Sequence, residues 1–355
     1  MRSGRTIAGA LALTAATIAL QLSAIATAAA QSVEQFYKGR TITLLIPSAP
    51  GGINDLDGRL VAQYLGRYIP GNPKIVPENL PGASGAAIAN RLSNTVERDG
   101  SVIAIVERAV PQLAIQGDPG AKFDPLKINW LGSLSSYAND AYLFTVNSST
   151  PIHSVDDLKS NKTPIQIGAM NPGTTNLTFA ILAQQLLGLN VKVVRGYTGA
   201  APIFLAMRSN EVDAQVVGFS SLKAGQPQLW RDHLVRPIIQ FARLTRLPEL
   251  SDVPTGRELI KDPKDLALLE FAEQPFFMAI PFAAPPGMPA DRAKALQDAF
   301  MAMTKDGDYL AGAQKLSIDT SAIDGEAVRK LIEKGAATPK DVIARYNDIT
   351  GMTQQ

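Results

Sequence analysis

Short runs of β-branched and other apolar residues alternate with stretches of helical period along this 355-residue chain, and this alternation constrains its fold more than any other feature. Residues 41–47 and 165–170 are typical of buried strands. Each run is followed, after a loop, by apolar residues at helical spacing, at residues 55–68 and 175–187. Strands that alternate with helices predict an α/β fold with largely parallel sheets flanked by helices.

The rest of the pattern indicates two similar units without a linker between them. Further strands are expected at residues 102–107, 142–147, 191–197, 213–219, 235–241 and 276–284, and further helices at residues 200–209 and 289–303. The chain is too long for one ordinary domain of about 100–200 residues, yet no low-complexity segment divides it. We therefore expect two α/β lobes joined by crossing strands, with helices near the carboxyl end packed across both.

The composition excludes several classes of site. The chain contains no cysteine, which removes thiol nucleophiles, disulfides and thiolate metal sites, and its two histidines are too few for a three-histidine metal site. No glycine pattern typical of dinucleotide or phosphate-loop binding occurs. The formal net charge of +2 gives no general attraction to nucleic acid or anionic membranes. We therefore expect no metal, no cofactor and no nucleic-acid partner.

The first thirty residues have the pattern of a secretory signal. Arg2 and Arg5 precede an apolar, alanine-rich run, and small residues at positions 28–30 form an A-x-A-like cleavage site. The alternative is an amino-terminal membrane anchor, which the missing charged stop-transfer segment disfavours. We predict a cleaved signal peptide at residues 1–30 and export to a bacterial periplasm.

The loop after the first expected strand, residues 47–55, is the first candidate binding site. It leaves a strand and enters a helix, so main-chain N–H groups and the positive end of the helix dipole converge there and favour an anion. Two successive glycines permit a positive φ and a close approach of the ligand. An ordinary turn capped by Asn54 or Asp55 explains the same pattern. Because two carboxylates would repel, Asp55 is expected either to cap its helix or to accept a hydrogen bond from a ligand amine or a water. The candidate ligand-binding residues here are Ser48, Pro50, Gly51, Gly52, Ile53, Asn54 and Asp55.

The loop at residues 170–176 holds the matching place in the second unit. It also runs from a strand to a helix, and it supplies hydroxyl and amide donors that suit a carboxylate without a full positive charge. A capped turn is again the alternative, but two such loops in matching places favour one ligand held between them. The candidate residues are Met170, Asn171, Thr174, Thr175 and Asn176, with Tyr197 and Phe219 as candidates for the wall of the cleft.

A hydrolase site has little support in the sequence. Residues 82–86 fall short of the G-x-S-x-G nucleophile elbow, because alanine stands at position 86. His153 and His233 lie in surroundings typical of surface or capping histidines. An exported hydrolase with a serine or carboxylate site is the alternative from another functional class, and we expect no catalytic residue.

Seven short segments, in this order, carry a resemblance to a known family. They are YKGRTI (37–42), PSAPGG (47–52), ENLPGASG (78–85), RDG (98–100), YTGAAP (197–202), NEVDA (210–214) and PPGMP (285–289). With Asp55 and Arg59 after the second segment, the chain resembles the solute-binding proteins of tripartite tricarboxylate transporters, the Bug family, over essentially its whole length after residue 30. One departure is the second loop, which is usually rich in glycine and serine and here reads Asn-Pro-Gly-Thr-Thr-Asn.

The resemblance implies a two-lobe periplasmic binding protein fold whose ligand cleft lies between the lobes. We expect residues 31–133 with about 253–305 in lobe one, and residues 134–252 with about 306–355 in lobe two. The implied function is capture of a small organic carboxylate by a monomeric receptor, which delivers it to the membrane subunits of the transporter. A binding protein that presents its ligand to a membrane signalling partner is the alternative within the same fold.

Overall fold

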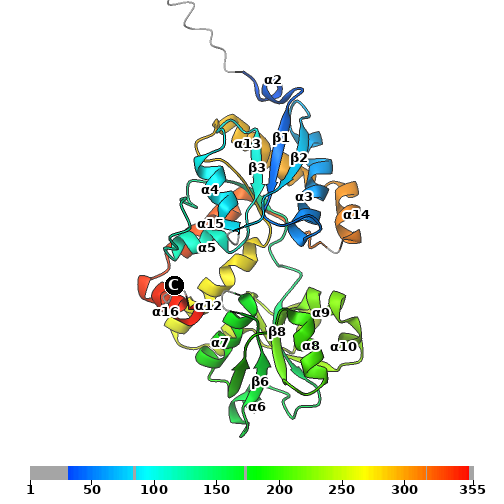
Figure 1. The fold of residues 1–355 in the computed structure, drawn as a ribbon, viewed down its shortest axis with the longest axis vertical. Coiled ribbons are helices and arrows are strands. Elements are labelled where there is room, and N and C mark those ends of the chain that lie inside the picture. Colours follow the sequence, from blue (N-terminus) through cyan, green and yellow to red (C-terminus); the bar gives the residue numbers. More distant parts are fainter. Residues whose placement is uncertain (1–30, 83–84, 172–173, 317, 352–355) are drawn as a thin grey trace, which may run out of the picture.

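The chain forms two lobes, one above the other in Figure 1, in a computed structural model that describes residues 31–82, 85–171, 174–316 and 318–351. The predicted signal peptide, residues 1–30, lies outside the described residues. Each lobe is a β-sheet between two layers of helices, which confirms the α/β class. In the described part of the chain, no helix is long and apolar enough to cross a membrane.

The first lobe is built on a six-stranded sheet of order β11-β4-β10-β3-β1-β2. Its strands are β1 (Thr41–Ile46), β2 (Lys74–Asn79), β3 (Val102–Ile105), β4 (Asn129–Ser133), β10 (Pro281–Ala284) and β11 (Ile323–Asp324). One face is covered by α2 (Val33–Tyr37), α3 (Ile53–Tyr64), η1 (Leu65–Tyr68), α13 (Ala290–Met303) and α14 (Gly307–Lys315). The other face is covered by α4 (Ala86–Asn94), α5 (Val110–Ile115) and α15 (Gly325–Ala336).

The sequence of β1 explains why both faces of this sheet are covered. Ile42, Leu44 and Ile46 are fully buried on one face, and Leu45 is fully buried on the other, in the same core cluster as Ala104 of β3. Successive side chains of a strand point to opposite faces, so an uninterrupted apolar run requires a layer of helices on each side.

The second lobe is built on a five-stranded sheet of order β7-β6-β8-β5-β9. Its strands are β5 (Tyr142–Asn147), β6 (Ile165–Gly168), β7 (Val191–Val194), β8 (Ala214–Gly218) and β9 (Val235–Phe241). One face is covered by α6 (Val155–Ser160), α7 (Thr175–Leu187), α11 (Gly256–Leu259), α12 (Pro263–Glu273) and α16 (Lys340–Thr350). The other face is covered by α8 (Ala200–Arg208), α9 (Phe219–Gly225), α10 (Pro227–Arg231) and the short η3 (Pro248–Leu250).

Both sheets are mixed, whereas the sequence predicted largely parallel ones. β10 pairs antiparallel with β3 and β4, and β5 pairs antiparallel with β8 and β9. These two strands follow the segments that cross between the lobes. A strand that enters a sheet from the edge where the parallel strands end has to run in the opposite direction, which a strand-by-strand interpretation of the sequence does not reveal.

The lobe boundaries also differ from those expected. We expected residues 253–305 in lobe one, but α12 packs in the core of lobe two, where Leu268 and Leu269 are fully buried. We expected residues 306–355 in lobe two, but α14 and α15 pack in lobe one and only α16 returns to lobe two. The amphipathic pattern of these helices identifies a buried face but not the sheet that covers it.

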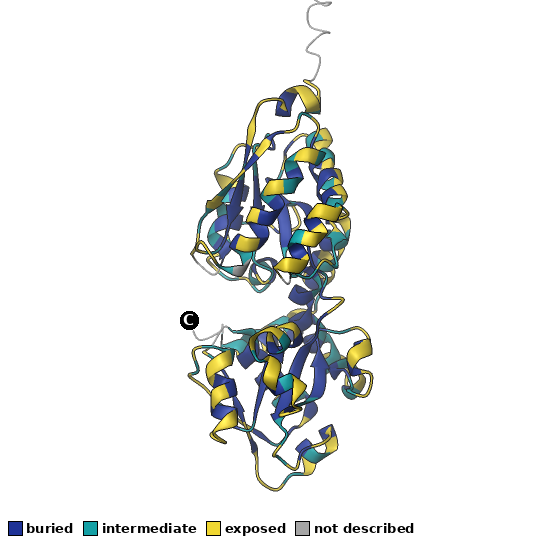
Figure 2. Cartoon of the chain, turned by 90° about the vertical axis from the view of Figure 1, so that its right-hand side faces the viewer, coloured by how far each residue is buried: buried dark blue, intermediate teal, exposed yellow. Residues whose placement is uncertain are grey.

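Three segments cross between the lobes: residues 134–141, residues 274–280 with the short helix η4 (Gln274–Met278), and residues 337–339. The first two run side by side, because Leu134 N–H donates to Ile280 O and Ala279 N–H donates to Ser135 O. Figure 2 shows the narrow junction that they form between the two bodies. Strands β4, β6 and β9 end on the side of this junction, so the loops after β1 and β6 lie at the edges of the sheets that face each other.

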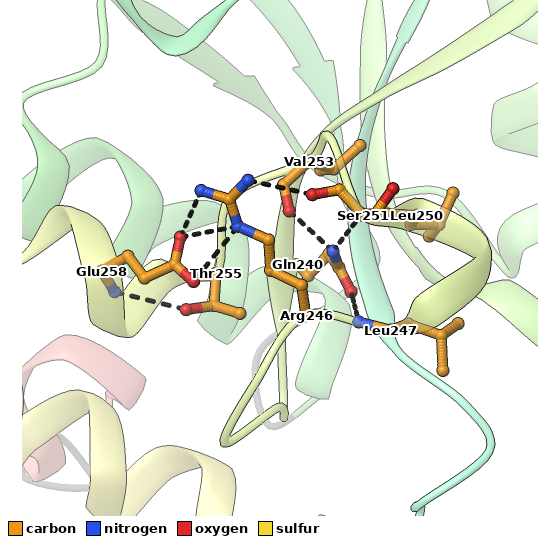
Figure 3. A network of polar contacts seen from close by, with 8 residues as sticks. All are labelled: Gln240, Arg246, Leu247, Leu250, Ser251, Val253, Thr255 and Glu258. Carbon is orange, nitrogen blue, oxygen red and sulfur yellow. Dashed lines mark hydrogen bonds and ion pairs between the residues drawn. The ribbon is translucent and has the colours of Figure 1, made fainter.

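The segment after β9 is held by a polar network inside lobe two (Figure 3). The buried Gln240 side chain donates to Leu250 O at 2.8 Å and accepts from Leu247 N–H at 3.0 Å. Arg246 forms an ion pair with Glu258 at 2.7 Å in the same network. This network fixes residues 246–258 and thereby the end of β9 next to the junction.

Candidate functional site

The first loop, residues 47–55, is held in shape by Asp55. Its carboxylate is buried and accepts hydrogen bonds from Gly51 N–H at 2.8 Å, Asn79 Nδ2 at 2.8 Å and Arg59 Nε at 2.9 Å. The hydrogen bonds from Arg59 and Gly51 lower the pKa of Asp55 to about 2, although burial acts in the opposite direction. Asp55 therefore closes its own loop as an anion from inside the first turn of α3. The expectation that it caps the helix is wrong, because the N-cap is Gly52 and no side-chain cap hydrogen bond is formed among the described residues.

Two residues outside the candidate set complete this loop. Asn79, at the end of β2, donates to Ser48 O at 2.9 Å as well as to Asp55. Arg59, one turn along α3, bonds both Asp55 and Asn79 Oδ1. Both residues occur in the segments that carry the family resemblance, but 24 residues separate Asn79 from Asp55, so only the pairing of β1 with β2 brings them together.

The two glycines of the first loop have different roles from those expected. Gly51 has the positive φ, +84°, whereas Gly52 has an extended backbone with φ of −72°. A side chain at Gly52 would meet Ser48 Oγ at 3.0 Å, so this position is restricted by space and not by φ. Ser48 Oγ itself is buried and has no hydrogen-bond partner among the described residues, which leaves it free to bond a ligand.

The remaining residues of the first loop lie at its rim. Pro50 is exposed, and the Asn54 side chain is partly buried and donates to the Glu107 carboxylate at the end of β3. Ile53 is the first residue of α3 and contributes its main chain. Glu107 is a further neighbour that the sequence interpretation missed. It follows the buried run of β3 directly and is partly buried, and this burial raises its pKa.

The second loop is held by Asn176. Its side chain is 1% exposed, accepts from Met170 N–H at 2.9 Å and donates to Val216 O of the neighbouring strand β8 at 2.5 Å. Thr174 Oγ1 donates to Asn171 O at 2.8 Å and accepts from Leu177 N–H, as the cap of α7. The Thr175 hydroxyl forms no hydrogen bond with another described residue. The second loop is thus closed by an amide where the first is closed by a carboxylate.

The two candidates for the cleft wall lie in different environments. Tyr197 is partly exposed and its hydroxyl donates to Glu211 at 2.7 Å; burial and this hydrogen bond raise its pKa to about 12. The Phe219 side chain is fully buried and packs edge-to-face on Trp230 at 4.8 Å. Phe219 can therefore contribute only its main chain to a ligand, because its ring belongs to the core of lobe two.

Main-chain donors are the chemistry that both loops offer. Within the described residues, no acceptor is bonded to the N–H groups of Asn54, Thr175 and Asn176, each in the first turn of its helix. Helix N-termini with unpaired N–H groups attract anions. No hydrogen bond or ion pair joins the described residues of the two loops to each other. His153 and His233 are exposed and lie before α6 and β9, at the end of lobe two away from these loops.

Comparisons with known proteins concern the fold and the relatives of this chain. A scan of protein-family models finds no match. A UPF0065 protein of Bordetella pertussis is 27% identical over 243 residues, which cover 66% of this chain and 70% of that protein. A TctC solute-binding protein from Polaromonas has a TM-score of 0.69 at 18% identity, covering 89% of this chain and 99% of that one. MatC from Rhodopseudomonas palustris, solved with bound malate, has a TM-score of 0.54 at 20% identity, covering 88% and 99% of the two chains.

The solved structures show that the fold is that of a two-lobe periplasmic binding protein, as expected, and the chain is similar to a UPF0065 protein and a TctC solute-binding protein.

Proposed function

We propose that this chain is a periplasmic receptor that captures a small organic carboxylate between its lobes and delivers it to the membrane subunits of a tripartite tricarboxylate-type transporter. The protein would act as a monomer after removal of residues 1–30. No covalent step is required of it, and the reaction it performs is binding and release.

One observation carries this proposal: two loops at facing sheet edges each end in a helix N-terminus whose first N–H groups have no acceptor among the described residues. The N–H groups of Asn54 on one side and of Thr175 and Asn176 on the other supply donors for one carboxylate. The buried Ser48 hydroxyl adds a fourth donor. Closure of the lobes would bring the two sets of donors onto one ligand and shift an existing equilibrium towards the closed form.

The similar proteins support the same chemistry. Malate is the ligand in the MatC structure, and the fold is shared over nearly the whole chain. Malate carries carboxylates that main-chain and hydroxyl donors can bind without a buried counter-charge.

A thermal-shift screen tests the proposal. The purified protein is heated with malate, citrate, benzoate and acetate in turn, and hits are measured by calorimetry. A ligand at a hundred times its dissociation constant should stabilise the protein by about 2.7 kcal/mol. The proposal fails if none of the four acids raises the melting temperature, and turnover of an ester by the same preparation would favour an exported hydrolase instead.

A further inference from the structure

A small pocket between the lobes contains an arginine that the proposed binding loops do not use. Its volume is about 120 Å³, and it is lined by Arg108 and Gln112 of lobe one and by Thr175, Thr178, Phe276 and Tyr346 of lobe two and the crossing segment. Thr175 also belongs to the second loop, so the pocket adjoins the proposed carboxylate site. Figure 1 shows α5, α12 and α16 meeting in this region.

Arg108 differs from the other partly buried arginines in having no oxygen partner. The others each donate to a carboxylate or a main-chain carbonyl, and they are Arg91, Arg236, Arg243, Arg257, Arg292 and Arg329. Within the described residues, no hydrogen bond or ion pair is formed by the Arg108 guanidinium. A guanidinium carries five N–H donors, and leaving them without acceptors in a closing site is costly.

The carboxylate of Glu107, the residue before Arg108, does not pair with the guanidinium. Glu107 accepts its hydrogen bond from Asn54 of the first loop and forms no ion pair with Arg108. The positive charge of Arg108 acts on Glu107 only through space, against the effect of burial on its pKa. Glu107 thus supports the first loop and leaves the Arg108 donors available.

The guanidinium is positioned by an aromatic platform. Its Cζ atom lies 4.3 Å from the centre of the Phe276 ring, in cation–π geometry. Phe276 is itself 1% exposed and contacts Tyr137, Tyr142 and Phe179 at ring distances of 5.0, 5.1 and 5.7 Å. The ring therefore holds the cation in place without neutralising it.

From these contacts we infer that Arg108 is a specificity residue of the cleft, and that it binds a negatively charged group of the ligand when the lobes close. The group is a carboxylate or another anion that lies beyond the one bonded by the main-chain donors. The Thr175 and Thr178 hydroxyls, from the opposite lobe, complete the set of donors around it. This inference rests on the proposed function and adds the charge selectivity that neutral donors alone do not supply.

Calorimetry with malate, citrate and benzoate on four proteins tests the inference. The proteins are the wild type, Arg108→Gln, Arg108→Lys and Arg231→Gln, the last removing an exposed cation of α10 that does not line this pocket. For the acid that the wild type binds best, Arg108→Gln should weaken binding at least about tenfold, and Arg108→Lys should weaken it less. Arg231→Gln should stay within about twofold of the wild type.

Two readouts separate recognition from a structural role. Wild-type affinity should fall as salt is raised from 20 to 300 mM (roughly the range over which screening sets in), and the affinity of Arg108→Gln should depend less on salt. The melting temperatures of the ligand-free proteins should agree. The inference is wrong if Arg108→Gln binds as tightly as the wild type, or if its loss of affinity follows a loss of ligand-free stability. If the wild type binds none of the three acids, the proposed function fails together with it.

Discussion

The two candidate loops both connect a strand to a helix, but a charged side chain holds the first and a neutral one holds the second. In the first loop, the ionised Asp55 accepts three hydrogen bonds, one of them from the exposed Arg59. In the second loop, the neutral Asn176 makes one hydrogen bond to the loop and one to the neighbouring strand β8. Asp55 and Asn176 both lie in the first turn of a helix, and each holds the loop that precedes this helix through its side chain. Among the described residues, the N–H groups of Asn54, Thr175 and Asn176 remain without an acceptor.

The difference follows from where each helix starts. Asp55 has Asn79 of the edge strand β2 and the solvent-exposed Arg59 beside it, so a charge can be balanced there. Asn176 is 1% exposed and has only main-chain partners, Met170 N–H and Val216 O, one donor and one acceptor. An amide satisfies both groups, whereas a carboxylate would leave Val216 O without its donor. The comparison teaches that the neighbours behind the loop, and not the ligand in front, decide which residue holds it.

The largest expected effect on stability comes from removing the Asp55 carboxylate. Asp55→Ala removes three hydrogen bonds to a buried carboxylate. It leaves Gly51 N–H without its acceptor, and Asn79 keeps only Ser48 O as an acceptor for its amide nitrogen. We expect a loss of about 3 kcal/mol in the free energy of unfolding, since hydrogen bonds to charged groups contribute about 1.5–3 kcal/mol each. Urea denaturation measures it. Ligand affinity should fall as well, because the first loop is no longer fixed.

The conservative variant Asp55→Asn sharpens this prediction. It retains an oxygen acceptor for Gly51 N–H but loses the charge that Arg59 bonds. The free energy of unfolding of Asp55→Asn should lie between that of the wild type and that of Asp55→Ala. If Asp55→Asn is as stable as the wild type, the charge of Asp55 does not contribute to stability, and a neutral side chain can hold the first loop as Asn176 holds the second.

The pH dependence should also separate the two binding helices. Asp57, on α3, is 1% exposed without a hydrogen-bond partner, and burial raises its pKa to about 7, whereas α7 contains no acidic residue. Between pH 4 and 7 the folded state keeps a proton that the unfolded state has released, so stability falls as pH rises. The expected fall is on the order of 3 kcal/mol.

Asp57→Asn tests this effect, because it removes the titrating group and should flatten the pH profile of urea denaturation between pH 4 and 7. Glu273, whose burial raises its pKa to about 7 in lobe two, keeps a part of the dependence in the variant. An unchanged slope in Asp57→Asn would assign the whole effect to other groups.

Removing the Asn176 amide should lower the free energy of unfolding less than removing the Asp55 carboxylate. Asn176→Ala removes two neutral hydrogen bonds and leaves Val216 O and Met170 N–H unsatisfied, which should lower the free energy of unfolding by about 2 kcal/mol. Thermal and urea denaturation of Asn176→Ala beside Asp55→Ala give the comparison directly. A larger loss in Asn176→Ala than in Asp55→Ala would reverse the order that we assign to the two loops.

The sequence reveals each loop but not what supports it. Thr174 caps its helix as the local pattern predicts, because the N–H group that it bonds lies three residues away. Asp55 bonds Gly51 N–H from inside its helix, which the pattern of a capped turn does not predict. β2 escaped prediction, since only Ile75 of this edge strand is fully or nearly buried and a proline and two charges interrupt it. Because β2 was not predicted, the contact between Asn79 and Asp55 could not be predicted either. The run at residues 276–284 is a strand only from Pro281, because an apolar run alone does not separate η4 from β10.

The smallest expected effects come from the two threonines of the second loop, and they should differ in kind. Thr174 caps α7 through its hydroxyl, so Thr174→Ala should cost about 1 kcal/mol of stability and little ligand affinity. The Thr175 hydroxyl has no partner among the described residues and lines the pocket between the lobes. Thr175→Ala should therefore be as stable as the wild type but lose about 0.5–1.5 kcal/mol of binding free energy. Thr175→Ser keeps the hydroxyl and should bind the ligand as the wild type does. Calorimetry and denaturation of all three variants would show whether the order is reversed, in which case Thr175 is the cap and the ligand contacts Thr174.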